Sequence, residues 1–153
     1  MPDEPLVRMV PVLGTQDLPA STGFYEWLGL TVRSEYPGYT ILAQGTEIDD
    51  AVEVHLSHSD EHDRGSAGVV YLRAGDARQL YERLRRDLEA AGRLFLVPAS
   101  GFTEALTDDL RAREDAGEDL VPLAEIDEKP WGMHEFGVID PGGWLVRVGS
   151  PAE

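Results

Sequence analysis

The sequence contains the same strand-to-helix pattern twice, and this repeat constrains the fold more than any other feature. Residues 10–29 read VPVLGTQDLPASTGFYEWLG, and residues 69–84 read VVYLRAGDARQLYERL. Each stretch begins with apolar, strand-forming residues, passes through an aspartate that can cap a helix (Asp17 and Asp76), and continues as an amphipathic helix. The pattern predicts an internal duplication of one unit, in which a strand is followed by a helix and then by further strands.

Short hydrophobic runs separated by turn residues predict the remaining strands. We expect strands at 6–13, 30–35, 39–43 and 52–56 in the first half, and at 67–73, 94–97 and 120–126 in the second. The acidic stretch 103–116 carries leucines on one side and predicts an additional helix.

A hairpin is predicted at the end of the chain. Residues 136–139 and 144–148 have the composition of strands, and the turn residues at 140–143 lie between them. Pro141 favours the first central position of a type II turn, and Gly142 is expected to adopt the positive φ that the second position requires.

Composition limits the classes of function. The 153 residues are enough for a single domain with its own core, and no apolar run is long enough to span a membrane. The acidic N-terminus is unlike a signal peptide. The absence of cysteine excludes disulfides, thiolate metal sites and cysteine nucleophiles, which fits a cytoplasmic protein. Twenty-nine acidic residues against thirteen basic ones give a net charge of −16, which argues against nucleic acid as a partner. The charge either steers a cationic ligand or serves solubility.

Three segments together resemble the vicinal oxygen chelate superfamily, which includes glyoxalases, extradiol dioxygenases and bleomycin-resistance proteins. VPVLGTQDLPASTGFYEWLGL (10–30) is similar to the family's first strand and helix, and YLRAGDARQLYERL (71–84) to the start of its second module. EIDEKPWGMHEFGVIDPGGWLVRVG (125–149) resembles the closing segment of the bleomycin-resistance branch, in which a PWG corner and an EF strand precede a DP-x-G turn.

The resemblance implies an α+β fold in one domain, residues 1–153, built from two βαβββ modules that form curved half-barrel sheets. Module one covers about 6–57 and module two about 67–149, with an insertion at about 93–119. In the bleomycin-resistance branch two chains usually pair by exchanging the N-terminal strand, and drug clefts lie at their interface. We therefore expect a homodimer, with strand exchange left open.

The resemblance also locates the metal ligands of the family's enzymes, and here those positions are occupied by Val10, Val69 and Arg147. Two apolar side chains and a guanidinium cannot ligate a metal, so we expect no metal, no cofactor and no catalytic residues. His55, His58 and His62 are an alternative metal cluster, but a strand would place the first two on opposite faces.

Without a metal, the expected chemistry is binding by aromatic stacking and charge. Trp131 lies at a glycine corner, Tyr36 and Tyr39 flank a predicted turn, and Glu35 could meet a positive group. Val69 occupies a position where better-known drug binders carry a tryptophan, which argues against bleomycin itself. The full set of ligand-binding candidates is Glu35, Tyr36, Tyr39, Val69, Tyr71, Trp131, Gly132 and His134.

Three hypotheses follow. The first is a non-catalytic protein that sequesters a bleomycin-like or other planar cationic antibiotic and so confers resistance. The second is a metal-dependent glyoxalase-type or dioxygenase-type enzyme of the same fold, in which His134 beside Glu135 could act in acid–base chemistry. The third is a sensor or carrier of an unrelated small molecule.

Overall fold

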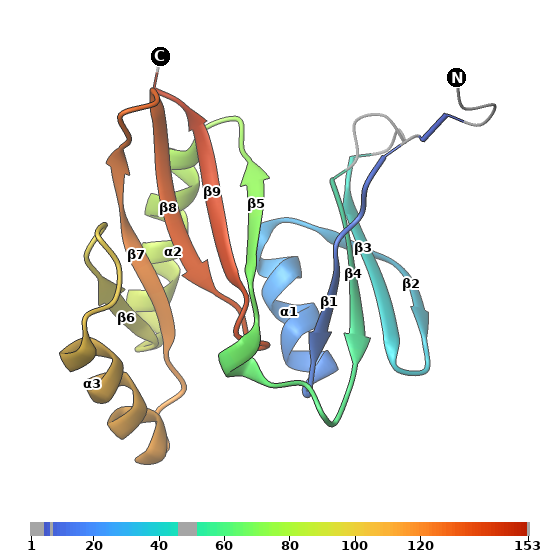
Figure 1. The fold of residues 1–153 in the computed structure, drawn as a ribbon, viewed down its shortest axis with the longest axis horizontal. Helices are drawn as coiled ribbons and strands as arrows, with labels where there is room; N and C mark the ends of the chain where they lie inside the picture. Colours follow the sequence, from blue (N-terminus) through green and yellow to red (C-terminus); the bar gives the residue numbers. More distant parts are fainter. Residues whose placement is uncertain (1–4, 7, 46–51, 153) are drawn as a thin grey trace. The chain divides into compact units, whose positions relative to one another are not determined.

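The computed structural model describes residues 5–6, 8–45 and 52–152, which form an α+β fold with two open sheets (Figure 1). The fold class expected from the sequence is therefore confirmed. The chain divides into two compact units, Met1–Arg64 and Gly65–Glu153, here called unit 1 and unit 2. No helix among the described residues is both long and apolar enough to cross a membrane.

Unit 1 is a four-stranded sheet with one helix on one face. In chain order its elements are β1 (Val12–Thr15), α1 (Leu18–Leu28), β2 (Thr31–Tyr36), β3 (Tyr39–Gln44) and β4 (Val52–His58), and the strand order is β1-β4-β3-β2. The carboxylate of Asp17 accepts a hydrogen bond from the Ala20 backbone N–H and caps α1, as predicted. Tyr25 of α1 is fully buried, as are Leu42, Val54 and Leu56 of the sheet.

Unit 2 is a five-stranded sheet. Its elements are β5 (Val69–Arg73), α2 (Ala77–Ala91), β6 (Leu94–Val97), α3 (Glu104–Asp115), β7 (Val121–Glu128), β8 (Met133–Ile139) and β9 (Leu145–Pro151), preceded by a short 3₁₀ turn at Arg64–Ser66. The strand order is β5-β9-β8-β7-β6. Asp76 caps α2 through the Gln79 N–H, and Gly92 ends it in the left-handed conformation.

The two sheets share one topology, which confirms the repeat in the sequence. In each unit the first strand runs parallel to the last, because β1 pairs with β4 and β5 pairs with β9. The intervening strands are antiparallel in both. The difference is the segment between α2 and β7, which adds strand β6 at the sheet edge and helix α3. These elements lie within the insertion expected at about 93–119.

The two faces of the sheet in unit 2 have different roles. Helix α2 covers one face, which lies behind the sheet in Figure 1. Phe136 and Val138 of β8 are buried, and the Phe136 ring meets Tyr81 of α2 edge-on, with ring centroids 5.5 Å apart. Since side chains alternate along a strand, Glu135 and Gly137 belong to the opposite face. We call that opposite face the open face.

Helix α3 of the insertion packs against the open face, whereas β6 extends the sheet and also contacts α2. Phe95 and Val97 of β6 and the adjoining Leu120 form a buried cluster with Leu106 and Leu110 of α3, and Ala124 of β7 also joins this cluster. Helix α3 therefore covers the part of the open face that belongs to β6 and β7, and leaves β8, β9 and β5 uncovered by it.

Two details of the sequence prediction are wrong. A strand was expected at 6–13, but β1 begins only at Val12, and Leu6 and Met9 are 99% and 95% exposed. The ladder with β4 begins at the pair Val12–His55, directly after Pro11, whose nitrogen has no proton to donate. The apolar composition of this run is typical of a buried strand, but burial also requires another element to cover the side chains. Among the described residues of this chain no element covers Leu6 or Met9.

The second error concerns the terminal turn. The residue with positive φ is Gly143 (87°) and not Gly142. The Gly143 N–H donates to the Asp140 carbonyl, and the Trp144 N–H donates to the buried Asp140 carboxylate. The left-handed residue thus follows the turn instead of lying at its centre, which is the arrangement of a three-residue hairpin loop.

Candidate functional site

A buried carboxylate on the open face of unit 2 holds two aromatic side chains. Glu135 of β8 is only 4% exposed. Its Oε2 accepts a hydrogen bond from the Tyr71 hydroxyl of β5 (2.7 Å) and another from the Trp131 indole N–H in the β7–β8 turn (3.0 Å). Both rings stay partly exposed, Tyr71 at 44% and Trp131 at 64%. One oxygen atom therefore fixes two rings that can contact a ligand.

The second oxygen of the same carboxylate has no such partner. Glu135 Oε1 is buried and makes no hydrogen bond within the described part of the chain. A buried polar atom without a partner costs about 1–3 kcal/mol, and more if it is charged. The fold therefore buries one carboxylate oxygen whose capacity to accept hydrogen bonds is unused by the described residues.

The electrostatics of the pair favour a protonated Tyr71. Desolvation raises the pKa of the Tyr71 phenol above its usual 10.0, and the hydrogen bond and negative charge of Glu135 raise it further, while Arg73 and Arg147 lower it. The hydroxyl therefore remains a donor to Glu135 throughout the neutral range.

Gly149 makes room for this arrangement. It lies on β9 opposite Glu135, and a Cβ at this position would lie 2.1 Å from the Tyr71 hydroxyl oxygen and 3.1 Å from Glu135 Cγ. Any side chain at 149 would displace the phenol. A glycine inside a strand often marks such a close approach.

A pocket of about 210 Å³ adjoins Glu135 on the open face. Its floor consists of residues of β7, β8 and β9, including Ala124, Gly137 and Leu145, and one wall is the loop 99–102 that links β6 to α3. The wall ends in Phe102, which stacks on Phe95 with the rings 12° from parallel. The insertion therefore encloses part of a face that would otherwise be open.

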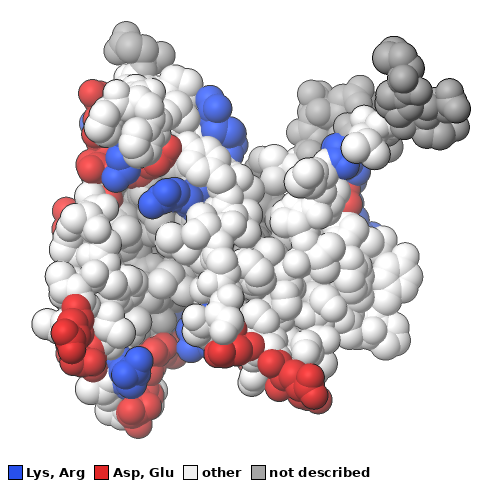
Figure 2. Space-filling model, in the orientation of Figure 1, with Lys and Arg blue, Asp and Glu red and all other residues white. Residues whose placement is uncertain are grey.

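The charges in the pocket are balanced, in contrast to the chain as a whole. Glu125 and Glu135 line it together with Lys129 and Arg147. Figure 2 shows Lys and Arg side chains over this sheet, with acidic side chains around α3 and also at the upper end of the sheet. The net charge of −16 is thus not concentrated at the pocket.

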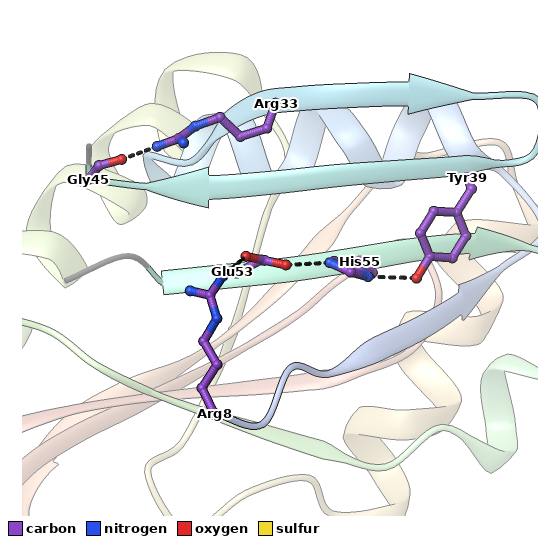
Figure 3. A network of polar contacts seen from close by, with 6 residues as sticks. All are labelled: Arg8, Arg33, Tyr39, Gly45, Glu53 and His55. Atoms are coloured by element: carbon purple, nitrogen blue, oxygen red, sulfur yellow. Dashed lines mark hydrogen bonds and ion pairs between the residues drawn. The ribbon is translucent and has the colours of Figure 1, made fainter. Parts of the chain in front are cut away.

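The corresponding face of unit 1 carries a row of connected polar side chains (Figure 3). The Tyr39 hydroxyl lies 2.6 Å from His55 Nδ1, and His55 Nε2 lies 2.5 Å from Glu53 Oε2. The other oxygen, Glu53 Oε1, is 2.5 Å from the Arg8 guanidinium. Since a carboxylate only accepts, His55 Nε2 carries a proton, and in the neutral ring Nδ1 accepts from the tyrosine.

The structure brings together part of the predicted site. Of the predicted residues, Tyr71 and Trp131 meet through Glu135, while Val69 shares their sheet face at the start of β5 and is exposed. Gly132 has a φ of 81°, which accounts for a glycine in the β7–β8 turn. The remaining candidates lie elsewhere: Glu35, Tyr36 and Tyr39 in unit 1, and His134 on β8.

His134 and Glu135 are adjacent in sequence but face opposite sides of the sheet. His134 lies on the α2 side, and its Nε2 is 3.5 Å from a Glu128 carboxylate oxygen. Glu135 was not among the predicted binding residues. A signal for it exists in the sequence, because Phe136 and Val138 must face the core, and strand alternation then puts 135 on the other side.

The positions of the family's metal ligands do not fit a metal here. Val10 lies before β1, Val69 opens β5, and Arg147 lies on β9 in register with Tyr71. None of these side chains can donate an electron pair to a divalent cation. Among the described residues no group of three His, Asp or Glu side chains is placed to hold a metal ion.

Solved structures share this fold. A bleomycin resistance determinant encoded on the transposon Tn5 matches with a TM-score of 0.65 at 18% identity, over 97% of this chain and 100% of that one. The bleomycin-binding protein of Streptomyces verticillus, solved with copper(II)-bleomycin, gives 0.62 at 19%, over 98% and 99%. Lactoylglutathione lyase from Agrobacterium tumefaciens gives 0.58 at 19%, over 95% and 94%. The fold is therefore shared by binding proteins and an enzyme.

No curated protein sequence matches this chain. The family model of the Glyoxalase/Bleomycin resistance protein/Dioxygenase superfamily, however, matches residues 8–148, which is nearly the whole sequence. The match agrees with the resemblance carried by the repeated strand-to-helix segments and by the PWG corner. The chain is a member of the Glyoxalase/Bleomycin resistance protein/Dioxygenase superfamily.

Proposed function

We propose that this protein binds and sequesters a planar, cationic, bleomycin-like antibiotic on the open face of unit 2 and thereby confers resistance. The observation that carries the proposal is the pair of exposed rings, Trp131 and Tyr71, held by one buried carboxylate. Rings fixed in this way lose little conformational freedom on binding, and they offer flat area and cation–π attraction to a planar cation.

Sequestration needs no catalytic group. Tight binding lowers the free concentration of the compound by mass action, so that one occupied site protects against one molecule. The structural similarity to bleomycin-binding proteins supports this mode of action, and the side chains at 10, 69 and 147, which cannot ligate a metal, make it preferable to the metal-dependent chemistry of the enzymes.

We further propose that two chains pair, as the resemblance implies. Leu6 and Met9 are almost fully exposed apolar side chains in a segment that lies outside the sheet of its own chain. A second chain would cover them. Replacing both by serine should then shift the protein from dimer to monomer in sedimentation velocity, and an unchanged sedimentation coefficient would remove this segment from the contact.

Calorimetric titration with bleomycin, phleomycin and unrelated planar compounds tests the binding proposal. We expect Trp131→Ala to weaken binding of the preferred compound by about 2 kcal/mol, as the loss of an aromatic anchor does. Arg86→Ala is the matched control. Arg86 is exposed on α2, the helix that covers the opposite face of the sheet, so this variant should bind with the affinity of the wild type. Equal affinity of both variants would exclude Trp131 from the site.

Metal analysis of protein purified without chelator separates binding from enzymatic activity. Stoichiometric metal that disappears on replacing His55 or His134 would favour the metal-dependent enzyme over sequestration. Expression in a bleomycin-sensitive host should raise survival in proportion to the amount of protein, since each molecule neutralises one ligand. Protection that exceeds this stoichiometry would indicate turnover.

A further inference from the structure

The pocket on the open face of unit 2 has the size of a single ring. At about 210 Å³ it lies below the roughly 300–1,000 Å³ of pockets that enclose a drug-sized ligand. It is larger than the cavity of roughly 150 Å³ that accepts benzene in an engineered protein. Phe102, Ala124, Leu145 and Ile139 make much of its lining apolar, which favours a flat hydrophobic group.

Arg147 projects from the floor of this pocket. Its neighbours on β9, Val146 and Val148, are buried on the face that α2 covers, so strand alternation puts Arg147 on the open face. The side chain is exposed and lines the pocket. Its partner on β8 is Gly137, which has no side chain, and a Cβ there would meet Leu145 Cδ1 at 3.0 Å. Arg147 therefore emerges beside the apolar floor that Leu145 forms.

On its other side Arg147 adjoins the aromatic pair. It is in register with Tyr71 on β5, whose hydroxyl lies over Gly149. Burial has the largest effect on the Tyr71 phenol and raises its pKa, whereas the positive charge of Arg147 acts in the opposite direction. Because such an effect weakens with distance, the guanidinium lies near the hydroxyl. Arg147 thus stands at the boundary between the pocket and Tyr71.

Arg147 is also the basic group in the lining that has no partner of its own. Lys129 Nζ is 2.8 Å from Asp127 Oδ1. No hydrogen bond or ion pair joins the Arg147 guanidinium to another side chain in the part of the chain that the structure describes. An accessible guanidinium presents parallel N–H donors in a plane, and the group that matches this fork is a carboxylate.

From these observations we infer that the pocket binds an aromatic or similarly flat apolar carboxylate, with the ring on Leu145 and Phe102 and the carboxylate on Arg147. The inference goes beyond the proposed function, because it concerns an anion in the pocket and not a cation on the exposed rings. A carboxylate is favoured over a phosphate-like group by charge. Two acidic and two basic side chains line the pocket, so a second negative charge on the ligand would find no cation to balance it.

Three ring compounds of one size test the inference on the intact protein: benzoate, benzamide and benzamidine, which are an anion, a neutral amide and a cation. Nuclear magnetic resonance titration measures their dissociation constants and shows whether the amides of residues 137, 145 and 147 shift. We expect benzoate to bind at least about fivefold more tightly than benzamide, since a well-oriented ion pair at a surface is worth about this factor. Equal binding of the two, or binding of neither, would overturn the inference. Tighter binding of benzamidine would overturn it as well, because Glu125 and not Arg147 would then select the ligand.

Phenylphosphonate tests the choice of a carboxylate. At about pH 8 it carries nearly two negative charges, whereas benzoate carries one. We expect benzoate to bind more tightly. The reverse order would overturn the assignment of the site to carboxylates.

Substitutions of Arg147 give the sharpest outcome. Arg147→Gln should abolish the preference for benzoate over benzamide, and Arg147→Lys should keep part of it, because lysine retains the charge and loses the planar fork. Arg73→Gln is the matched control. Arg73 also acts on the Tyr71 phenol, yet it does not line the pocket, so the preference should stay unchanged. An equal loss in both variants would mean that the field of the sheet, and not a contact with Arg147, selects the anion.

Two aromatic substitutions locate the ring. Phe102→Ala removes the end of the pocket wall and should weaken benzoate and benzamide alike by about fivefold, the loss of part of an apolar contact. Trp131→Ala should leave both unaffected. If Trp131→Ala weakened benzoate and Phe102→Ala did not, the ring would lie on the aromatic pair and the inference would fail. The antibiotic titration is a separate measurement, so its failure would overturn the proposed function and leave the carboxylate site standing.

Discussion

The two units build the same sheet, yet the carboxylates on their corresponding faces are in opposite states. In unit 1 both oxygens of Glu53 have a side-chain partner, Arg8 for one and His55 for the other, and His55 in turn contacts the Tyr39 hydroxyl (Figure 3). In unit 2 only one oxygen of Glu135 is occupied by side chains of the described residues. The duplicated scaffold thus carries a carboxylate on β4 of unit 1 that is engaged through both oxygens, and one on β8 of unit 2 that is engaged through a single oxygen.

The contrast between the two carboxylates predicts opposite effects of the same substitution. Glu53→Gln should lower the free energy of unfolding by about 1–2 kcal/mol, because the charge that faces Arg8 and His55 is lost. Glu135→Gln should change it by less than about 0.5 kcal/mol, because the amide still accepts from Tyr71 and Trp131 and one buried group without a partner, the NH₂, replaces another, the charged oxygen. Urea unfolding of both variants measures the difference, and equal losses would contradict the comparison.

A pair of glycines sharpens the comparison at the level of packing. Gly149→Ala should displace the Tyr71 hydroxyl from Glu135. The affinity for the planar ligand should then fall by about fivefold, since one of the two rings loses its position. Gly14→Ala in β1 is the matched control, because its Cβ would meet the His62 ring of unit 1 at 2.8 Å. Calorimetry should find normal affinity for the control. Equal weakening by both would mean that unit 1 also contributes to binding.

The pH dependence of stability offers a third test. The folded pKa of Tyr71 is raised above 10.0, chiefly by desolvation and then by Glu135. A raised pKa means that the neutral phenol stabilises the fold fully below the unfolded value, and that this contribution is lost as the pH rises through the folded value. The difference in unfolding free energy between wild type and Tyr71→Phe should be constant from about pH 7 to about 9 and should shrink above about pH 10. A difference that changes near neutrality would point to another group.

The smallest expected effect concerns the net charge. If the charge of −16 steers a cationic ligand, raising the salt concentration from about 0.05 to about 0.5 M should slow association by about threefold or less, because the pocket itself is balanced. Stopped-flow tryptophan fluorescence measures this rate. An association rate independent of salt would leave solubility as the role of the charge.

Local signals in the sequence were sufficient for most of the fold. Asp17 and Asp76 cap their helices as expected, because an N-cap depends only on residues within one turn. The strand expected at 6–13 was wrong for the opposite reason. Its apolar residues resemble a buried strand, but burial depends on a distant partner that the local pattern does not specify.

The candidate site was predicted only in part. Trp131 and Tyr71 were predicted as ligand-binding candidates, but their common partner Glu135 was not. The contact of Tyr71 with Glu135 joins residues 64 positions apart and follows from the register of β5, β9 and β8. The pocket wall could not have been predicted at all. The insertion was recognised by its length, whereas the side of the sheet on which it packs is decided by Phe95 and Val97 meeting Leu106 and Leu110.

The shared acceptor atom has a consequence for how this sequence can vary. Since Tyr71 and Trp131 both depend on Glu135 Oε2, a change at 135 that removes the acceptor releases both rings at once, whereas a change at either ring leaves the other in place. Relatives that lose the glutamate are therefore expected to lose the tyrosine and the tryptophan together, and relatives that keep it are free to exchange one ring. Positions 71, 131 and 135 should then covary as a triplet with the glutamate as its common member.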